Sequence, residues 1–182
     1  MEKPLIAPLS LRECVHYYIH IEEKRSSGKN SYWKTLIEES NSCNFLIHDG
    51  SSFAHISDKN IKSYIVQDRS YTSGFMNDAS ANLERYLHLK GYESENFLGF
   101  NKSMRYKEGV LEIGEEIAVY GKAQWKDVAD LFLLEKYDKV LEITSQKDIA
   151  IYLRDDPKTT LRTAKKEHKA RRKESSHKRK FR

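Results

Sequence analysis

Two groups of histidine with cysteine or aspartate are the residues of this chain best suited to chemistry. In the first group, Cys14, His16 and His20 fall on one face of a predicted strand. A thiolate with two imidazoles can ligate zinc. Residues four apart on a strand are separated by about 13 Å, however, which is too far for one shared ion. We therefore expect a polar strand face here and no metal site.

The second group is His48, Asp49 and His55. Asp49 and Gly50 lie between two apolar runs in CNFLIHDGSSFAHIS (43–57), and an Asp-Gly pair in that setting is a strong signal for a β-hairpin. An aspartate before a glycine commonly stabilises the turn itself. We expect Asp49 to serve the turn rather than catalysis.

Arg105 and Glu108 are the third candidate pair. They are three residues apart in an extended segment, so they must lie on opposite faces and need separate partners. An ion pair between Arg105 and a carboxylate of another strand is expected, and a ligand-binding arginine is the alternative. The sequence contains neither a Gly-x-Ser-x-Gly elbow nor a glycine-rich phosphate loop. We accordingly predict no catalytic residues and no cofactor.

Basic residues are concentrated at the C-terminal end of the chain. Residues 158–182 contain twelve Lys/Arg and two Asp/Glu, whereas residues 1–157 contain 20 basic and 25 acidic residues. Such asymmetry predicts a segment that meets polyanions, either lipid headgroups or nucleic acid, and the alternative is a solvated, partly disordered terminus. The candidate polyanion-binding residues are Lys165, Lys166, Lys169, Arg171, Arg172, Lys173, Lys178, Arg179 and Lys180.

Length and cysteine usage set further bounds. A chain of 182 residues fits one domain with appendages. Its two cysteines, Cys14 and Cys43, are too few for a disulfide framework or a four-ligand zinc site. No run approaches the ~20 apolar residues that span a bilayer, and no signal peptide is evident. We expect this chain by itself to be soluble.

The candidate residues described above lie mainly on predicted short strands. Alternation and turn residues predict strands at 13–23, 32–38 and 61–66, a loop at 25–30, a hairpin within 43–57, a second hairpin at 105–121 around Gly114, and two strands at 139–143 and 148–154. This pattern indicates an α+β protein: a mainly antiparallel, OB-like small β-barrel with one inserted helix.

Two helices are predicted. The first is ASANLERYLHLK (79–90). Asn77-Asp78 before it offers a cap, three of its apolar residues (Leu83, Tyr86, Leu87) share a face, and Gly91 after it ends the helix. Asp156-Pro157 opens a second helix that extends to about residue 173 and has only a small apolar face. We expect a barrel domain at 1–157 and a basic helix with a disordered tail at 158–182.

An ordered set of residues extends over roughly 5–163. It opens with PLSLRECVHYY (8–18), which contains Cys14, and closes with IYLRDDPKTTLRT (151–163). Between these segments lie Trp33, Phe45, Asp49, Gly50, Arg105, Glu108, Leu111, Gly114, Val119 and Gly121. This set resembles the GIDE domain, also called BAM for "beside a membrane". The domain is found in mitochondrial and chloroplast RING ubiquitin ligases and in bacterial membrane proteins without a RING.

The resemblance implies an OB-like barrel held next to a membrane, in which the residues of this set have structural roles. We call them the signature residues. Relatives carry a membrane helix before the domain, so an N-terminal anchor upstream of Met1 and a position on the cytoplasmic face are expected. The chain also departs from the family. Two cysteines cannot supply the eight zinc ligands of a RING, so ubiquitin transfer is not expected here, and the last helix leads into the basic segment instead of a membrane span.

These observations favour a non-catalytic, membrane-proximal binding or sensing domain with an anionic membrane surface as its partner. A protein partner is a further expectation, nucleic acid is expected through the basic segment only, and no small-molecule substrate is expected. The alternative is a soluble OB-like adaptor that binds nucleic acid or a protein through its basic segment and a sheet edge. Aromatic residues of the first half, such as Tyr17 and Tyr64, occupy alternating strand positions, where we expect packing to explain them.

Overall fold

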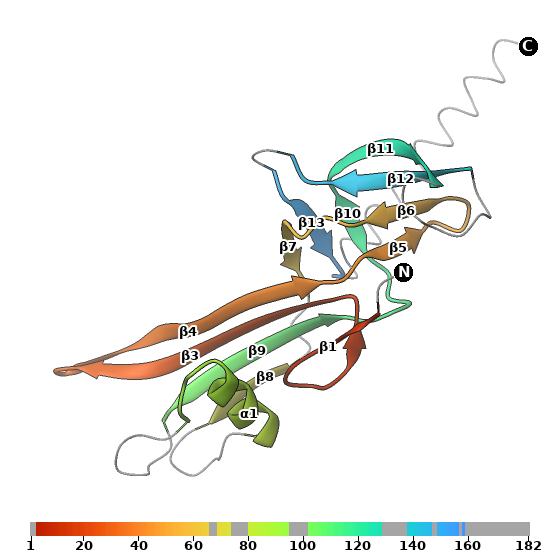
Figure 1. Ribbon diagram of the computed structural model, residues 1–182. Coiled ribbons are helices and arrows are strands. Elements are labelled where there is room, and N and C mark those ends of the chain that lie inside the picture. The colour runs from red at the N-terminus through yellow and green to blue at the C-terminus, as the bar shows by residue number, and fades with distance from the viewer. Residues whose placement is uncertain are drawn as a thin grey trace, which may run out of the picture.

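The computed structural model describes residues 3–65, 69–73, 80–94, 102–128, 138–146, 149–156 and 158. These residues are mostly β-strand with one short helix, which confirms the α+β class. They divide into two regions (Figure 1). The hairpin region contains β1–β4, β8, β9 and α1, and the small-sheet region contains β5–β7 and β10–β13.

The hairpin region is built on one antiparallel sheet of four strands. The strand order is β4 (Asn30–Ser42), β3 (His16–Ser27), β9 (Met104–Leu111) and β8 (Arg69–Ser73). The predicted loop at 25–30 is wrong, because β3 extends to Ser27 and β4 begins at Asn30. Only a tight turn with Gly28 at φ +60° separates them. Polar residues can continue a ladder in a long exposed hairpin, since its outer end needs no apolar face.

Helix α1 (Ala81–Leu89) covers the sheet of the hairpin region. Its residues Leu83, Tyr86 and Leu87 are buried, as predicted, in a core with strand residues such as Ile19 and Ile21. The cap is Ser80, whose hydroxyl accepts a hydrogen bond from the Leu83 amide at 3.3 Å. The predicted cap at 77–78 lies outside the described residues. The helix ends beside Gly91, which has φ +77° as a helix stop requires.

The small-sheet region contains two further sheets. One has the order β11 (Lys122–Asp127), β12 (Lys139–Thr144), β6 (Phe53–Ile56) and β5 (Phe45–His48), and the other has β10 (Ala118–Tyr120), β13 (Ile151–Arg154) and β7 (Ile61–Tyr64). The hairpin predicted within 43–57 is confirmed by the antiparallel β5–β6 pair. The β12–β6 and β13–β7 pairs are parallel, so the fold is mainly but not wholly antiparallel.

A second apolar core lies between these two sheets. Ile56, Ile151 and Leu153 are fully buried in it, and Phe45 is buried beside them. Leu111, the last residue of β9, also belongs to this core. Because β9 is a central strand of the hairpin region, Leu111 ties the two regions together.

The predicted hairpin at 105–121 is wrong. Strand β9 pairs with β3 and β8, and β10 pairs with β13. Both edges of β9 are thus occupied, so it cannot also accept the strand that follows it. Gly114 does reverse the chain, with φ +92°, but the chain then leaves for another sheet. Likewise β12 and β13, predicted around one polar turn, both form and pair with different neighbours.

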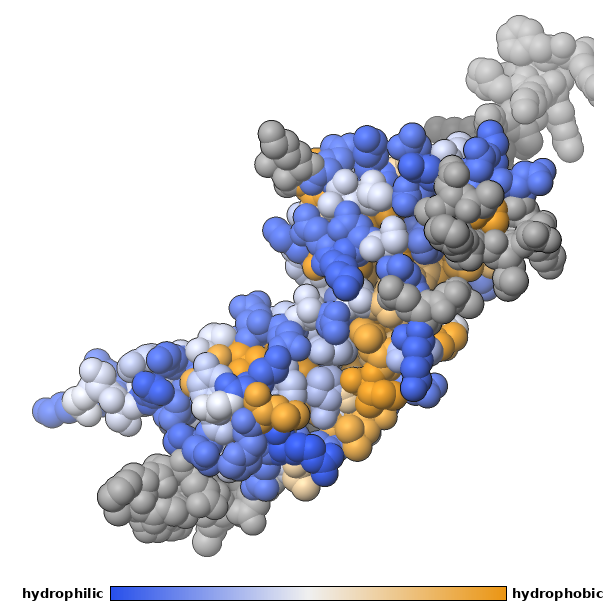
Figure 2. Space-filling view, in the orientation of Figure 1, coloured by the Kyte–Doolittle hydropathy of each residue, from blue (hydrophilic) through white to orange (hydrophobic). Residues whose placement is uncertain are grey.

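The remaining strands are short. β1 (Leu5–Ile6) pairs with β2 (Glu13–Cys14) along the hairpin region. Figure 2 shows a hydrophobic patch beside this N-terminal segment, on a surface that is otherwise largely hydrophilic in this view. Ile6 and Leu11 are about half exposed in this segment. Among the described residues no closed barrel is found, and none of their helices is long and apolar enough to cross a bilayer. The helix expected after Asp156 lies outside them, apart from Lys158.

Candidate functional site

The first predicted group, Cys14, His16 and His20, does not converge on one point. His16 Nδ1 lies 2.5 Å from the hydroxyl of Ser42, and His20 Nε2 lies 3.2 Å from the hydroxyl of Thr35. Each histidine therefore has its own partner on β4. Among the described residues, no three His, Cys, Asp or Glu side chains are grouped to hold a metal ion. The predicted polar strand face is met only in part, because His20 is partly exposed while Cys14 and His16 are buried.

His16 is nevertheless unusual because its ring is fully buried at the junction of the two regions. It pairs in register with Ser42 on one side and with Leu111 on the other. Burial lowers the pKa of His16 from 6.5 to about 4, so the ring is neutral near pH 7. Burial likewise raises the pKa of the Cys14 thiol to about 11, which makes it a poor nucleophile. Both groups belong to the interior of the fold.

Asp49 serves the β5–β6 turn, as predicted. Its Oδ1 accepts hydrogen bonds from the amides of Ser51 at 2.9 Å and Ser52 at 2.8 Å, and from the Ser51 hydroxyl at 2.8 Å. Gly50 follows with φ +90°. His55 is buried on β6, while the ring of His48 lies against Phe53. The second predicted group is a hairpin turn with its flanks.

Arg105 and Glu108 lie on opposite faces of β9 and have separate partners, as their spacing predicted. Arg105 donates two hydrogen bonds to the carboxylate of Glu22 on β3, one of them from Nη2 at 2.9 Å. The guanidinium also lies 4.5 Å from the ring centre of Trp33. The hydrogen bond from Arg105 lowers the pKa of Glu22. The predicted arginine–carboxylate pair therefore links three strands through two signature residues and Glu22.

Glu108 is buried and holds the N-terminal segment. Its two carboxylate oxygens accept hydrogen bonds from the backbone amides of Leu9 and Ser10, each at 2.9 Å. Only 3% of Glu108 is exposed. Because a buried carboxylate needs such donors, the contact fixes a segment almost a hundred residues away in sequence to the central strand. Glu108 is thus positioned by the fold as a structural tether.

The other signature residues pack or turn the chain. Phe45 and Leu111 belong to the second core, and Gly114 has a positive φ. Gly121 is needed for close approach, because a Cβ there would lie 2.7 Å from Cγ2 of Ile143. These placements agree with a structural role for the signature. The candidate polyanion-binding residues, Lys165 to Lys180, lie outside the described residues.

A group of side chains that sequence reasoning missed lies on the outer face of the β10–β13–β7 sheet. The register places Tyr120, Tyr152 and Lys62 in one row across the strands, and Ala118, Arg154 and Tyr64 in the next. Side chains alternate along a strand, and the intervening residues Ile151 and Leu153 face the core. We call Lys62, Tyr64, Tyr120, Tyr152 and Arg154 the aromatic–basic face.

The tyrosines of this face lie in contact range of one another while two remain largely exposed. The rings of Tyr64 and Tyr152 are stacked with centroids 6.0 Å apart, and Tyr120 is 6.3 Å from Tyr152. The Arg154 guanidinium lies 5.7 Å from the centre of the Tyr64 ring. Tyr64 is 56% exposed and Tyr120 is 66% exposed. The expectation that packing explains the aromatics holds for buried Tyr17 and is wrong for Tyr64.

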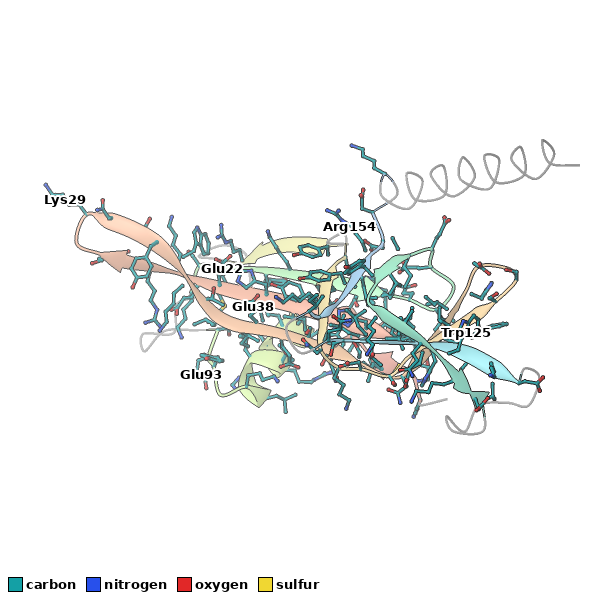
Figure 3. The ribbon with its side chains drawn as sticks, turned by 90° about the horizontal axis from the view of Figure 1, so that it is seen from above. Glu22, Lys29, Glu38, Glu93, Trp125 and Arg154 are labelled. Atoms are coloured by element: carbon teal, nitrogen blue, oxygen red, sulfur yellow. The ribbon has the colours of Figure 1, made fainter. Side chains whose placement is uncertain are left out.

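A groove of about 750 Å³ borders the aromatic–basic face. Lys62 and Tyr64 of β7 line one side of it, and Tyr18 with Glu38 and Glu39 lines the other. Glu39 accepts a hydrogen bond from Lys90, whereas Glu38 is exposed and bonded to the Tyr18 hydroxyl at 3.0 Å. Figure 3 labels Glu38 on the hairpin region and Arg154 at the end of β13. The groove therefore has a basic, aromatic side and an acidic side.

No family model, curated protein or solved structure matches this chain. One sequence signal could have pointed to the missed face. In IKSY (61–64) Ile and Ser alternate with Lys and Tyr, and in IYLR (151–154) Ile and Leu alternate with Tyr and Arg. Two strands therefore each present an aromatic and a basic side chain on the same face.

Proposed function

We propose that this chain is a non-catalytic binding module that works beside an anionic membrane surface. The observation that carries the proposal is the separation of roles among its polar residues. His16, Glu22, Glu108 and Asp49 are used within the fold, while aromatic and basic side chains are presented to solvent at the aromatic–basic face.

The membrane side of the proposal rests on charge. Strand β13 ends at Arg154, and residues 158–182, which follow shortly after it, contain twelve Lys/Arg. Basic residues near an anionic leaflet contribute about 1 kcal/mol each, and the attraction falls with salt. The resemblance of the signature residues to the GIDE domain also supports a position beside a membrane. The proposal therefore includes an OB-like arrangement of the sheets, a position at the cytoplasmic face and an anchor before Met1.

Vesicle flotation tests this function. The full chain should float with phosphatidylcholine vesicles that contain phosphatidylserine, and should remain at the bottom with phosphatidylcholine alone. Changing the nine candidate basic residues between 165 and 180 to glutamine should abolish flotation, and raising the salt should weaken it. A matched control with glutamine at Lys29 and Lys34, on the exposed β3–β4 hairpin, should float as the parent does. If the variant with nine glutamine substitutions floats as well as the parent does, the membrane proposal is overturned.

A second candidate function is a soluble adaptor that binds a protein segment as an added strand. The groove favours it, because within the described part of the chain β7 pairs with β13 alone and β4 with β3 alone. Each strand therefore presents an unpaired edge, and such edges accept extended peptides. Replacing Ser63 by proline would remove one backbone donor from β7. This adaptor would then lose its partner while vesicle flotation stayed unchanged.

A further inference from the structure

The proposed function treats the aromatic–basic face as a binding surface but names no ligand for it, because the membrane contact is assigned to the basic segment. Three tyrosines and two cations occupy five of the six outward positions in the two rows of paired residues, and Ala118 occupies the sixth. A ligand that fits this face must offer flat apolar groups to the rings and negative charge to Lys62 and Arg154. We propose that the face binds single-stranded nucleic acid, with bases on the tyrosines and phosphates on the two cations.

Stacking supports this occupant. Aromatic side chains on an exposed sheet hold unstacked bases in several nucleic-acid-binding folds. Tyr64 and Tyr120, with 56% and 66% of their surface exposed, leave ring surface available to a base, and Tyr152 lies between them with centroids 6.0 and 6.3 Å away. Each stacked base should therefore tighten binding by about tenfold or more.

The charge of the face distinguishes nucleic acid from the other ligands that bind tyrosine rings. A quaternary ammonium group or a basic peptide would also bind aromatic rings, but Arg154 and Lys62 would repel it at this face. Anionic lipid headgroups would satisfy the two cations and leave the rings without a planar partner. Nucleic acid satisfies both, and its phosphates can continue toward the basic segment that begins after residue 157.

The acidic side of the groove fixes where the strand lies. Glu38 is exposed across the groove from Tyr64 and Lys62, so it repels a phosphate that enters the groove. The nucleic acid therefore lies over β7, β13 and β10 and stays outside the groove. This placement predicts that removing the Glu38 charge will strengthen binding, whereas a basic peptide in the groove would bind less well after the same change.

The test is a titration of a fluorescent oligothymidylate of about 15 nucleotides, followed by anisotropy at about 0.15 M salt. The protein is the full chain with its nine basic residues between 165 and 180 changed to glutamine, so that the face is measured alone. Tyr64→Ala and Tyr152→Ala should each weaken binding about tenfold. Tyr64→Phe and Tyr152→Phe should retain it, because the ring is kept. Glu38→Gln should tighten it. An oligouridylate of the same length should bind with similar affinity, because uracil offers a π-face for stacking as thymine does and the phosphates carry the same charge.

Tyr32→Ala is the matched control, because Tyr32 is 51% exposed on β4 in the hairpin region. It should leave the affinity unchanged, and urea unfolding should show that the Tyr64 variants remain folded. The proposal is overturned if the alanine variants bind the oligonucleotide as tightly as the parent, or if only the unmodified basic segment supports binding. It is also overturned if the tyrosine changes abolish flotation with anionic vesicles while oligonucleotide binding persists, since the face would then be a lipid surface.

Discussion

The hairpin region and the small-sheet region each bury an apolar core, but they use their polar side chains in opposite ways. In the hairpin region, Glu108 and the Arg105–Glu22 pair connect segments that are distant in sequence. In the small-sheet region, the rows of Tyr64, Tyr152 and Arg154 face solvent. Ionisable residues that could have formed a functional site thus stabilise the fold in the hairpin region. In the small-sheet region, exposed aromatic and basic residues form the surface that is available to a ligand.

The largest expected effect comes from removing the buried tether of the hairpin region. Glu108→Ala leaves the amides of Leu9 and Ser10 without their acceptor in a buried site. We expect a loss of about 3 kcal/mol or more in the free energy of unfolding, measured by urea titration. Glu112→Gln is the matched control, because its pair with Arg12 is partly exposed and should contribute less than about 1 kcal/mol. Equal losses in the two variants would show that Glu108 is not a tether.

The next effect is a dependence of stability on pH that His16 controls. Its pKa is lowered to about 4 in the folded chain from 6.5, so between these values the unfolded chain binds a proton that the folded chain does not. Stability should therefore fall as pH falls from 6.5 to 4, by about 2–3 kcal/mol from this group. In His16→Gln the fall over the same range should be smaller by that amount. An unchanged slope would mean that His16 titrates normally.

A smaller effect is expected in the small-sheet region, where packing rather than polar contact determines the cost. Gly121→Ala brings a methyl group to 2.7 Å from Cγ2 of Ile143, which we expect to cost about 1–2 kcal/mol of stability. The cost should shrink when Ile143 is also changed to alanine, because the clash is then relieved. Thermal or urea unfolding of the four proteins in this cycle measures it. If the losses of the two single variants simply add in the double variant, the cost of Gly121→Ala does not come from contact with Ile143.

Local patterns predicted part of this fold well. Apolar spacing located α1 by Leu83 and Leu87, and Asp49-Gly50 located the β5–β6 hairpin, because both signals act within a few residues. The opposite faces of Arg105 and Glu108 also followed from their spacing alone.

Long-range pairing could not be predicted in the same way. Nothing near Gly114 shows that β9 already has β3 and β8 on its two edges, so the following strand was wrongly paired with it. The aromatic–basic face likewise joins Tyr64, Tyr120 and Tyr152 from three separate strands, two of which run parallel. Only the sheet order reveals that they are neighbours.

We propose that the small-sheet region carries the binding surface and that the hairpin region supports it. Amide chemical-shift mapping of the full, isotope-labelled chain with the same oligothymidylate would locate the surface residue by residue. We expect shifts concentrated at residues 61–64, 118–120 and 151–154, and little change at Glu108 or in the outer part of the β3–β4 hairpin, where Figure 3 labels Lys29. Shifts concentrated on the hairpin region, or confined to the basic segment after residue 158, would contradict it.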